Sequence, residues 1–173
     1  MVYPSKHPIQ TIDTQTMIDQ QAFLDIVRLT PLVSIDLLIR SADDGLLMGL
    51  RLNEPAAGYW FVPGGRILKD ETIAEAFERI SKGELGTAIT LDQARLIGAF
   101  THHYDTNFHK AKGIGTHYVV LAYEVATDID IPKLPKDQHS QYRWVHADDD
   151  PSSVHENSHV YFSALGISPR KSS

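Results

Sequence analysis

Residues 60–86 read WFVPGGRILKDETIAEAFERISKGELG, and this stretch decides the fold. It enters through a Gly-Gly turn and continues into a segment with helical spacing. Thr72 and Glu75 have the spacing of a capping box, which marks the start of a helix. Gly86 follows the last helical position and is a typical C-terminal stop. The sequence therefore predicts a Gly-Gly turn followed by a helix that ends at about Leu85.

The predicted helix carries one carboxylate on its apolar side. Ile73, Ala76, Phe77 and Ile80 recur at helical spacing and mark the face expected to be buried. Glu84 is the next position on that face. A buried carboxylate is costly unless it is neutralised, and a cation is the simplest partner. We therefore expect a cation beside Glu84.

A second pair of charges flanks the start of the same helix. Glu71 and Arg79 lie eight residues apart across the junction between loop and helix, where they can pair and hold the turn. Glu75, one helical turn before Arg79, is an alternative partner. We interpret Glu71 as structural and leave the role of Arg79 open.

Composition limits the class of protein. The chain has 173 residues, enough for one domain with a core, and it has no cysteine. It shows no signal peptide and no apolar run near ~18 residues, so we expect a soluble cytoplasmic protein without membrane contact. The formal net charge of −6 argues against non-specific binding of nucleic acid.

Patterning outside the central stretch predicts the remaining elements. Helical spacing predicts a helix over 17–28, with Phe23, Ile26 and Val27 on one face. A turn at 43–45 predicts a hairpin that pairs strands 32–39 and 46–51. Further extended segments and a final helix follow, over 60–62, 94–104, 116–125, 141–145 and 154–165.

These elements predict an α/β fold, an α/β/α sandwich around a mixed β-sheet. Residues 17–168 should form a single domain, preceded by a disordered extension over 1–16 and followed by a tail over 169–173. The basic, glycine-containing loop over 107–115 is predicted to be a flexible lid.

The spacing within residues 65–86 resembles the Nudix box, G-x5-E-x7-R-E-U-x-E-E-x-G-U, where U is aliphatic. Nudix enzymes hydrolyse nucleoside diphosphates linked to another group and use a divalent metal. The box is incomplete here, because Ile80 and Gly83 stand where the family has glutamates and Ser81 stands at an aliphatic position. Glu84 is the helix carboxylate that remains, which implies fewer bound metal ions than in a generic member.

Residues 134–144, LPKDQHSQYRW, narrow the resemblance. A Gln-His pair before a Tyr-Arg-Trp strand, together with one retained helix glutamate, resembles the GDP-mannose mannosyl hydrolase family within the Nudix superfamily. The resemblance extends from about Met17 onward. Segments that agree with it are 30–36, 58–66, 104–108 and 116–121.

This resemblance implies Mg²⁺-dependent transfer of a glycosyl group from a GDP-sugar to water. Water attacks C1 of the sugar with inversion, and GDP leaves. The implied metal set is the Gly64 carbonyl, Glu84 and the Gln138 side chain around one Mg²⁺, for which Mn²⁺ can substitute. His139 is the implied general base, since an unperturbed imidazole titrates near ~6.5. The family also implies a homodimer.

Two arginines and a tyrosine are implied to contact the diphosphate. Arg51 and Arg66 flank the metal turn, and guanidinium groups suit two-pronged phosphate contacts that stabilise a leaving group. Tyr118 resembles a family tyrosine at the diphosphate. A charge at the end of a surface strand is the alternative for Arg51.

Four further residues are implied to lie at the substrate. Asp36, in an otherwise apolar strand, and His102 are placed near the sugar, where they can bind hydroxyls or stabilise positive charge at C1. Tyr104 is a weaker candidate for substrate contact. Phe23 is a candidate to stack on guanine. Core packing is the alternative for Tyr104, Tyr118 and Phe23.

Two rival functions stay open. The first is a conventional Nudix pyrophosphatase that releases GMP and a sugar 1-phosphate; the missing glutamates argue against it. The second is a sensor that binds a nucleotide sugar without turnover, against which Glu84, Gln138 and His139 argue together. The loop over 109–115 departs from the family, so the choice among mannose, glucose and fucose also stays open.

Overall fold

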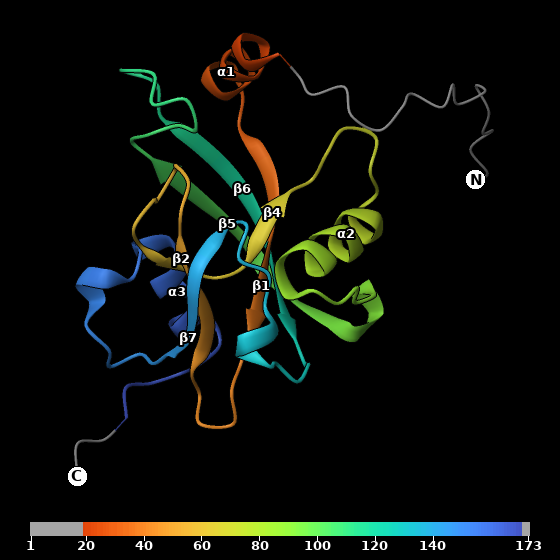
Figure 1. Cartoon of the computed structure of the whole chain (residues 1–173), viewed down its shortest axis with the longest axis vertical. Helices are drawn as coiled ribbons and strands as arrows, with labels where there is room; N and C mark the ends of the chain where they lie inside the picture. Colours follow the sequence, from red (N-terminus) through yellow and green to blue (C-terminus); the bar gives the residue numbers. More distant parts are fainter. Residues whose placement is uncertain (1–18, 171–173) are drawn as a thin grey trace, which may run out of the picture.

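Two β-sheets with helices on both sides make up the computed structural model, which describes residues 19–170 (Figure 1). The four-stranded sheet has the order β4-β1-β6-β5, and the three-stranded sheet has the order β3-β2-β7. The strands are β1 (Leu32–Ile39), β2 (Leu46–Arg51), β3 (Trp60–Phe61), β4 (Gly64–Arg66), β5 (Ala94–Tyr104), β6 (Thr116–Val125) and β7 (His139–Val145). The extension predicted over 1–16 lies outside the described residues.

In this described part of the chain, three α-helices cover the sheets: α1 (Gln20–Leu29), α2 (Ile73–Leu85) and α3 (Glu156–Ala164). Short 3₁₀ turns follow at Leu91–Gln93, Ile131–Lys133 and Pro151–Ser153. Figure 1 shows α2 on one side of the strands and α3 on the other. Because β1 runs parallel to β6 and antiparallel to β4, the sheet is mixed. The predicted α/β/α sandwich is therefore confirmed.

Strand β1 is the centre of the molecule and is buried on both faces. Successive side chains of a strand point to opposite faces. Ile35 and Leu37 belong to the core that contains residues of α2, whereas Leu38 belongs to the core that contains residues of α3. Asp36 alternates with Ile35 and Leu37, so its carboxylate points toward the α3 side, where it is 5% exposed.

Helix α2 has the predicted ends. The Thr72 and Glu75 capping box is present, and Gly86 takes the left-handed conformation with φ 76°. Ala76, Phe77 and Ile80 are buried as expected, but Ile73 is 41% exposed, so its predicted burial is wrong. Helical side chains lean toward the N-terminus, and Ile73 is the first helical residue, so its side chain points past the start of the helix.

The hairpin predicted between β1 and β2 is wrong. The two strands belong to different sheets, and the one bridge between their ends joins Arg40 and Leu46. Leu46, Leu47 and Met48 are all fully buried, so β2 needs packing partners on both faces. It obtains them by lying between the two cores, since Leu47 belongs to one core and Leu46 and Met48 belong to the other. Within its own sheet, β2 pairs with β3 and β7.

The N-terminal helix is present from Gln20, and Val27 is buried as predicted. Ile26 is 37% exposed, and Leu24 is buried instead. The buried face of the helix is therefore rotated by part of a helical turn from the predicted one. No helix within residues 19–170 is long and apolar enough to cross a membrane.

Candidate active site

One cavity of about 670 Å³ is lined by residues of both sheets and of helices α1 and α2. Its volume lies in the range of sites that enclose a small-molecule ligand. Every site residue predicted from sequence lines it: Phe23, Asp36, Arg51, Gly64, Arg66, Glu84, His102, Tyr104, Tyr118, Gln138 and His139. The fold therefore brings together residues from eight segments of the chain.

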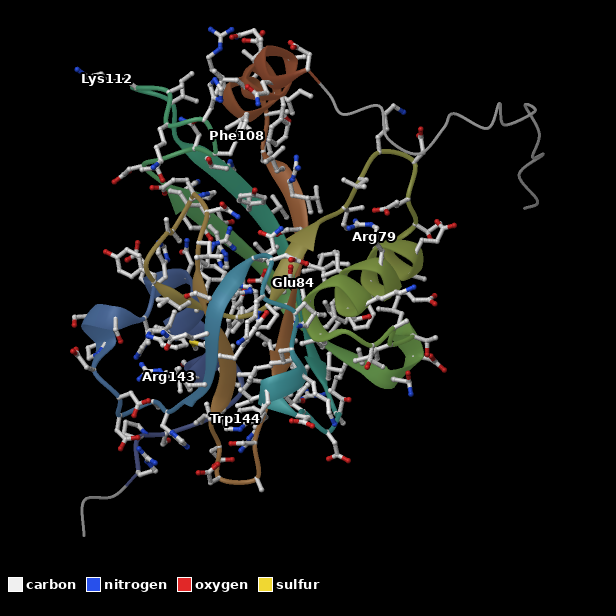
Figure 2. The ribbon with its side chains drawn as sticks, in the orientation of Figure 1. Arg79, Glu84, Phe108, Lys112, Arg143 and Trp144 are labelled. Atoms are coloured by element: carbon white, nitrogen blue, oxygen red, sulfur yellow. The ribbon has the colours of Figure 1, made fainter. Side chains whose placement is uncertain are left out.

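Glu84 is a buried carboxylate at the last turn of α2, and Figure 2 shows it between that helix and the strands. It is 9% exposed, and its Oε2 atom has no hydrogen-bond partner among the described residues. Burial raises the pKa of Glu84 to about 7, although the nearby charge of Arg51 opposes the shift. A divalent cation fits this oxygen, because it would satisfy the lone pairs and keep the carboxylate ionised.

The other predicted metal donors are not acidic side chains. Within residues 19–170, no group of three or more Asp, Glu, His or Cys side chains is arranged to hold a metal. A metal at Glu84 would therefore need backbone and amide oxygens, as the Gly64 carbonyl and Gln138 supply. The Oε1 atom of Gln138 accepts a 3.4 Å hydrogen bond from Asn53 Nδ2. Gln138 is thus tethered to a residue that sequence reasoning did not single out.

Gly64 is required by the close approach of β4 to β1. A Cβ atom at this position would lie 2.6 Å from both Asp36 Oδ1 and the Ile35 carbonyl oxygen. Backbone atoms cannot yield at that distance, so a side chain would force the strands apart. The Gly64 carbonyl stays a predicted metal ligand, and the structure adds that the lack of a side chain at Gly64 lets the neighbouring strand approach.

The two positions without the box glutamates differ in surroundings. Ile80 is 3% exposed and packs against Gly65, at 3.1 Å from where a Cβ atom would lie. Gly83 lines the cavity, and a Cβ atom there would meet nothing within 4 Å. One missing carboxylate is thus replaced by core packing and the other by open space.

His139 is a buried imidazole beside Glu84. Its Nδ1 atom lies 3.4 Å from Glu84 Oε2 and 3.1 Å from the Tyr142 hydroxyl. Its Nε2 atom is buried and has no hydrogen-bond partner in the described part of the chain. Burial, and to a smaller extent the nearby charge of Arg51, lowers the pKa of His139 to about 4. The ring is therefore neutral over a wider pH range than an exposed imidazole.

Gly49 on β2 gives the imidazole of His139 its space. A Cβ atom at Gly49 would lie 2.4, 2.5 and 2.8 Å from three carbon atoms of His139. Sequence reasoning missed this glycine. The available signal was its position inside an apolar strand, which is typical of a close approach by another group.

Asp36 joins a buried polar cluster with α3. Its Oδ2 atom accepts a 2.7 Å hydrogen bond from the Tyr161 hydroxyl, which lies 3.4 Å from His102 Nε2. Burial raises the pKa of Asp36 to about 7 and lowers that of His102 to about 4. Tyr161, which sequence reasoning did not identify, thus links the two residues predicted to lie near the sugar.

The two arginines predicted to bind the diphosphate both face the cavity. The buried Nε atom of Arg51 has no hydrogen-bond partner among the described residues. The Arg66 guanidinium lies over the Phe23 ring at 4.1 Å, and the Phe108 ring lies 4.6 Å from the same ring. A base that stacks on the face of Phe23 would therefore displace one of these neighbours.

Glu71 and Arg79 make the pair predicted from sequence. Arg79 Nη2 donates to Glu71 Oε2 and to the Arg66 carbonyl oxygen, each at 2.8 Å. Arg79, labelled in Figure 2, thereby ties helix α2 to the end of β4. Arg79 therefore has at least a structural role, which the sequence had left open.

Asn107 organises the loop predicted to be a lid. Its side chain is fully buried, and Nδ2 donates to the carbonyl oxygens of Ala111 and Ile114 at 2.8 and 2.7 Å. Its Oδ1 accepts from the backbone of His109 and Ala111. The loop therefore has an internal scaffold, while its predicted movement stays a prediction.

The NUDIX domain family model matches residues 30–164, and the chain belongs to the Nudix hydrolases. Members of this family generally use divalent metals such as Mg²⁺. Over 129 residues the chain is 43% identical to the low-salt glycan biosynthesis protein Agl8 of Haloferax volcanii. That match covers 74% of this chain and 79% of the relative.

Solved structures share the fold. The MutT NUDIX hydrolase of Burkholderia pseudomallei is 23% identical, with a TM-score of 0.60 over 79% of this chain and 98% of that chain. The NUDIX domain of Shewanella oneidensis NrtR, solved with ADP ribose, is 16% identical, with a TM-score of 0.58 over 87% and 92%. These similarities establish the Nudix fold. They do not identify the substrate, which has to be argued from the residues of the site.

Proposed function

We propose that this protein is a Mg²⁺-dependent hydrolase of GDP-mannose that releases GDP and free mannose, with GDP-glucose as a second candidate substrate. The observation that carries the proposal is the pairing of the buried carboxylate of Glu84 with the buried, neutral imidazole of His139 in one cavity. The 43% identity to a relative named for glycan biosynthesis supports a sugar-containing substrate.

Glu84, the Gly64 carbonyl and Gln138 would hold the metal, which when bound supplies positive charge against the diphosphate. Arg51 and Arg66 contact the same diphosphate and stabilise the charge that grows on departing GDP. The Nε atom of Arg51 supports this role, since it is a buried donor without a partner in residues 19–170 that a phosphate oxygen would satisfy.

His139 accepts the proton of the attacking water. Its neutral state suits a base, and its Nε2 atom is a buried acceptor without a partner in the described residues. Because this atom is closed to bulk solvent, the attacking water must be admitted to it before the reaction. Asp36 and His102 line the same cavity, and in this proposal they contact the sugar.

The test is product analysis of GDP-mannose with Mg²⁺ in ¹⁸O-enriched water. GDP without ¹⁸O is expected, because attack at C1 leaves every phosphate oxygen in place. The label is measured in the nucleotide, since the C1 oxygen of free mannose exchanges with solvent. GDP that carries ¹⁸O, or GMP with mannose 1-phosphate, would show attack at phosphorus and overturn the proposal. Binding without turnover would favour a sensor.

His139→Gln supplies the site control for that assay. Loss of a general base should reduce kcat by roughly 10²–10⁴-fold. His103→Gln, which changes an exposed histidine on β5, should leave kcat unchanged. Equal turnover of His139→Gln and wild type would remove His139 from the mechanism.

A further inference from the structure

The Tyr142 hydroxyl lies between His139 and the backbone carbonyl of Pro135. It donates to the Pro135 carbonyl oxygen at 2.9 Å, and its oxygen lies 3.1 Å from His139 Nδ1. A carbonyl oxygen can only accept, so the single hydroxyl proton is committed to Pro135. The hydroxyl oxygen therefore offers His139 a lone pair, and a hydrogen bond forms only if Nδ1 carries a proton.

The second neighbour of the same nitrogen, at a longer distance, favours the same tautomer more weakly. Glu84 Oε2 lies 3.4 Å from His139 Nδ1, and an ionised carboxylate is also an acceptor. With an acceptor on each side, an unprotonated Nδ1 would face two lone pairs. The surroundings of the ring thus favour the tautomer with its proton on Nδ1.

A β-bulge makes the contact between His139 and Tyr142 possible. Residues three apart in a regular strand point to opposite faces. Here Gly49 pairs with Tyr142 while Arg51 pairs with His139, so two steps along β2 match three steps along β7. The extra residue in β7 turns both side chains to one face, as bulges commonly do beside functional sites.

We infer that Tyr142 is a positioning residue that fixes the proton of His139 on Nδ1 and so makes Nε2 the atom that accepts a proton from the attacking water. The catalytic part of this inference rests on the proposed function. A neutral imidazole carries one proton, so a protonated Nδ1 leaves the lone pair on Nε2. That atom is buried and lacks a partner among residues 19–170, as expected of an acceptor reserved for water.

The test is long-range proton–nitrogen correlation NMR of ¹⁵N-histidine-labelled full chain with Mg²⁺ at pH 8. His139 signals are assigned by their loss in His139→Gln. The expected pattern is a protonated Nδ1 and an unprotonated Nε2. A protonated Nε2 in the wild type would overturn the inference whatever the enzyme does.

Tyr142→Phe removes the acceptor and keeps the ring. We expect the His139 signals to move toward a tautomer mixture, and kcat to fall by about tenfold with KM little changed, the size of one lost hydrogen bond. Tyr123→Phe is the matched control, since Tyr123 is a core tyrosine that packs on Phe77. It should alter neither the tautomer nor kcat.

The outcomes separate this inference from the proposed function. A Tyr142→Phe variant with the wild-type tautomer and kcat overturns the inference while leaving GDP-mannose hydrolysis intact. The converse outcome is also possible to recognise. If Nδ1 of His139 is protonated in the wild type and the tautomer changes in Tyr142→Phe, the inference on Tyr142 is supported. If the same protein does not release unlabelled GDP, the proposed reaction is refuted.

Discussion

At the scale of single residues, the site is marked by polar atoms that the described protein leaves unsatisfied. Glu84 Oε2 and His139 Nε2 are both buried without hydrogen-bond partners, and each such atom costs on the order of 1–3 kcal/mol. Native proteins keep few of these atoms, and two adjacent ones point to ligands that complete them. A cation at Glu84 and a water at His139 are the ligands that their chemistry selects.

Magnesium should therefore stabilise the wild-type protein. Binding to the folded state adds about 2.7 kcal/mol when the free metal is 100 times its Kd. Thermal unfolding with increasing Mg²⁺ should show a rising Tm, and Glu84→Gln should reduce the rise. Glu78→Gln, an exposed change on the same helix, is the control and should keep the wild-type response. Equal titrations for Glu84→Gln and wild type would refute Glu84 as a ligand.

Gly49→Ala should displace the imidazole of His139. The added methyl group would lie within 2.8 Å of His139 carbons, so the ring must move. We expect kcat to fall by at least tenfold and unfolding free energy by about 1–3 kcal/mol, as for an overpacked core site. Gly98→Ala, on strand β5 with its nearest neighbour at an ordinary 3.6 Å, is the matched control. Wild-type kcat in Gly49→Ala would show that the exact ring position is unimportant.

At the scale of elements, a forked set of hydrogen bonds from Arg79 adds to the packing between helix α2 and strand β4. Arg79 bonds both Glu71 and the Arg66 carbonyl, so a single guanidinium holds the loop that presents Arg66 to the cavity. Arg79 also lines the cavity, and its contact with the Arg66 carbonyl holds the end of β4 in place.

Arg79→Lys keeps the charge and loses the fork. Because an ammonium cannot make the same paired contacts, the unfolding free energy should fall by about 1 kcal/mol in denaturant titrations. Arg95→Lys tests a second arginine–glutamate pair, in which Arg95 is 70% exposed, and should change stability little. An equal decrease in unfolding free energy in the two variants would mean that the paired hydrogen bonds of Arg79 stabilise the fold no more than those of Arg95.

At the scale of the whole molecule, two ionisable groups that line the cavity affect the pH dependence of stability in opposite directions. Burial raises the pKa of Asp36 to about 7 but lowers the pKa of His102 to about 4. The unfolded chain binds a proton at His102 below ~6.5, whereas the folded chain does not until pH 4. His102 therefore makes stability rise from pH 4 to 6.5, while Asp36 makes it fall over a similar range.

His102→Gln isolates one of these contributions. Wild type should lose up to roughly 3 kcal/mol more stability than this variant on acidification from pH 7 to 4, because one pKa unit corresponds to 1.36 kcal/mol. His103→Gln, on the adjacent exposed position of β5, is the control. Chemical unfolding at several pH values measures the difference. Parallel pH profiles for His102→Gln and wild type would contradict the buried neutral state of His102.

Features that depend on near neighbours were predictable from the sequence. The capping box of α2, its glycine stop and the span of β1 follow from residues a few positions apart. The chemistry-bearing residues were also recognisable, and the fold places all of them at one cavity. Their individual roles stay predictions for the experiments above.

Contacts between distant segments were decided only by the tertiary structure. Pairing β2 with β7 instead of β1 seats His139 against Gly49, and its bulge brings Tyr142 to the ring. Packing of α3 carries Tyr161 to Asp36, 125 positions away. Sequence periodicity describes which face of an element is apolar, but it holds no information on which other element covers that face. The sequence by itself thus determined the elements and the reactive groups, and long-range packing decided how those groups are oriented.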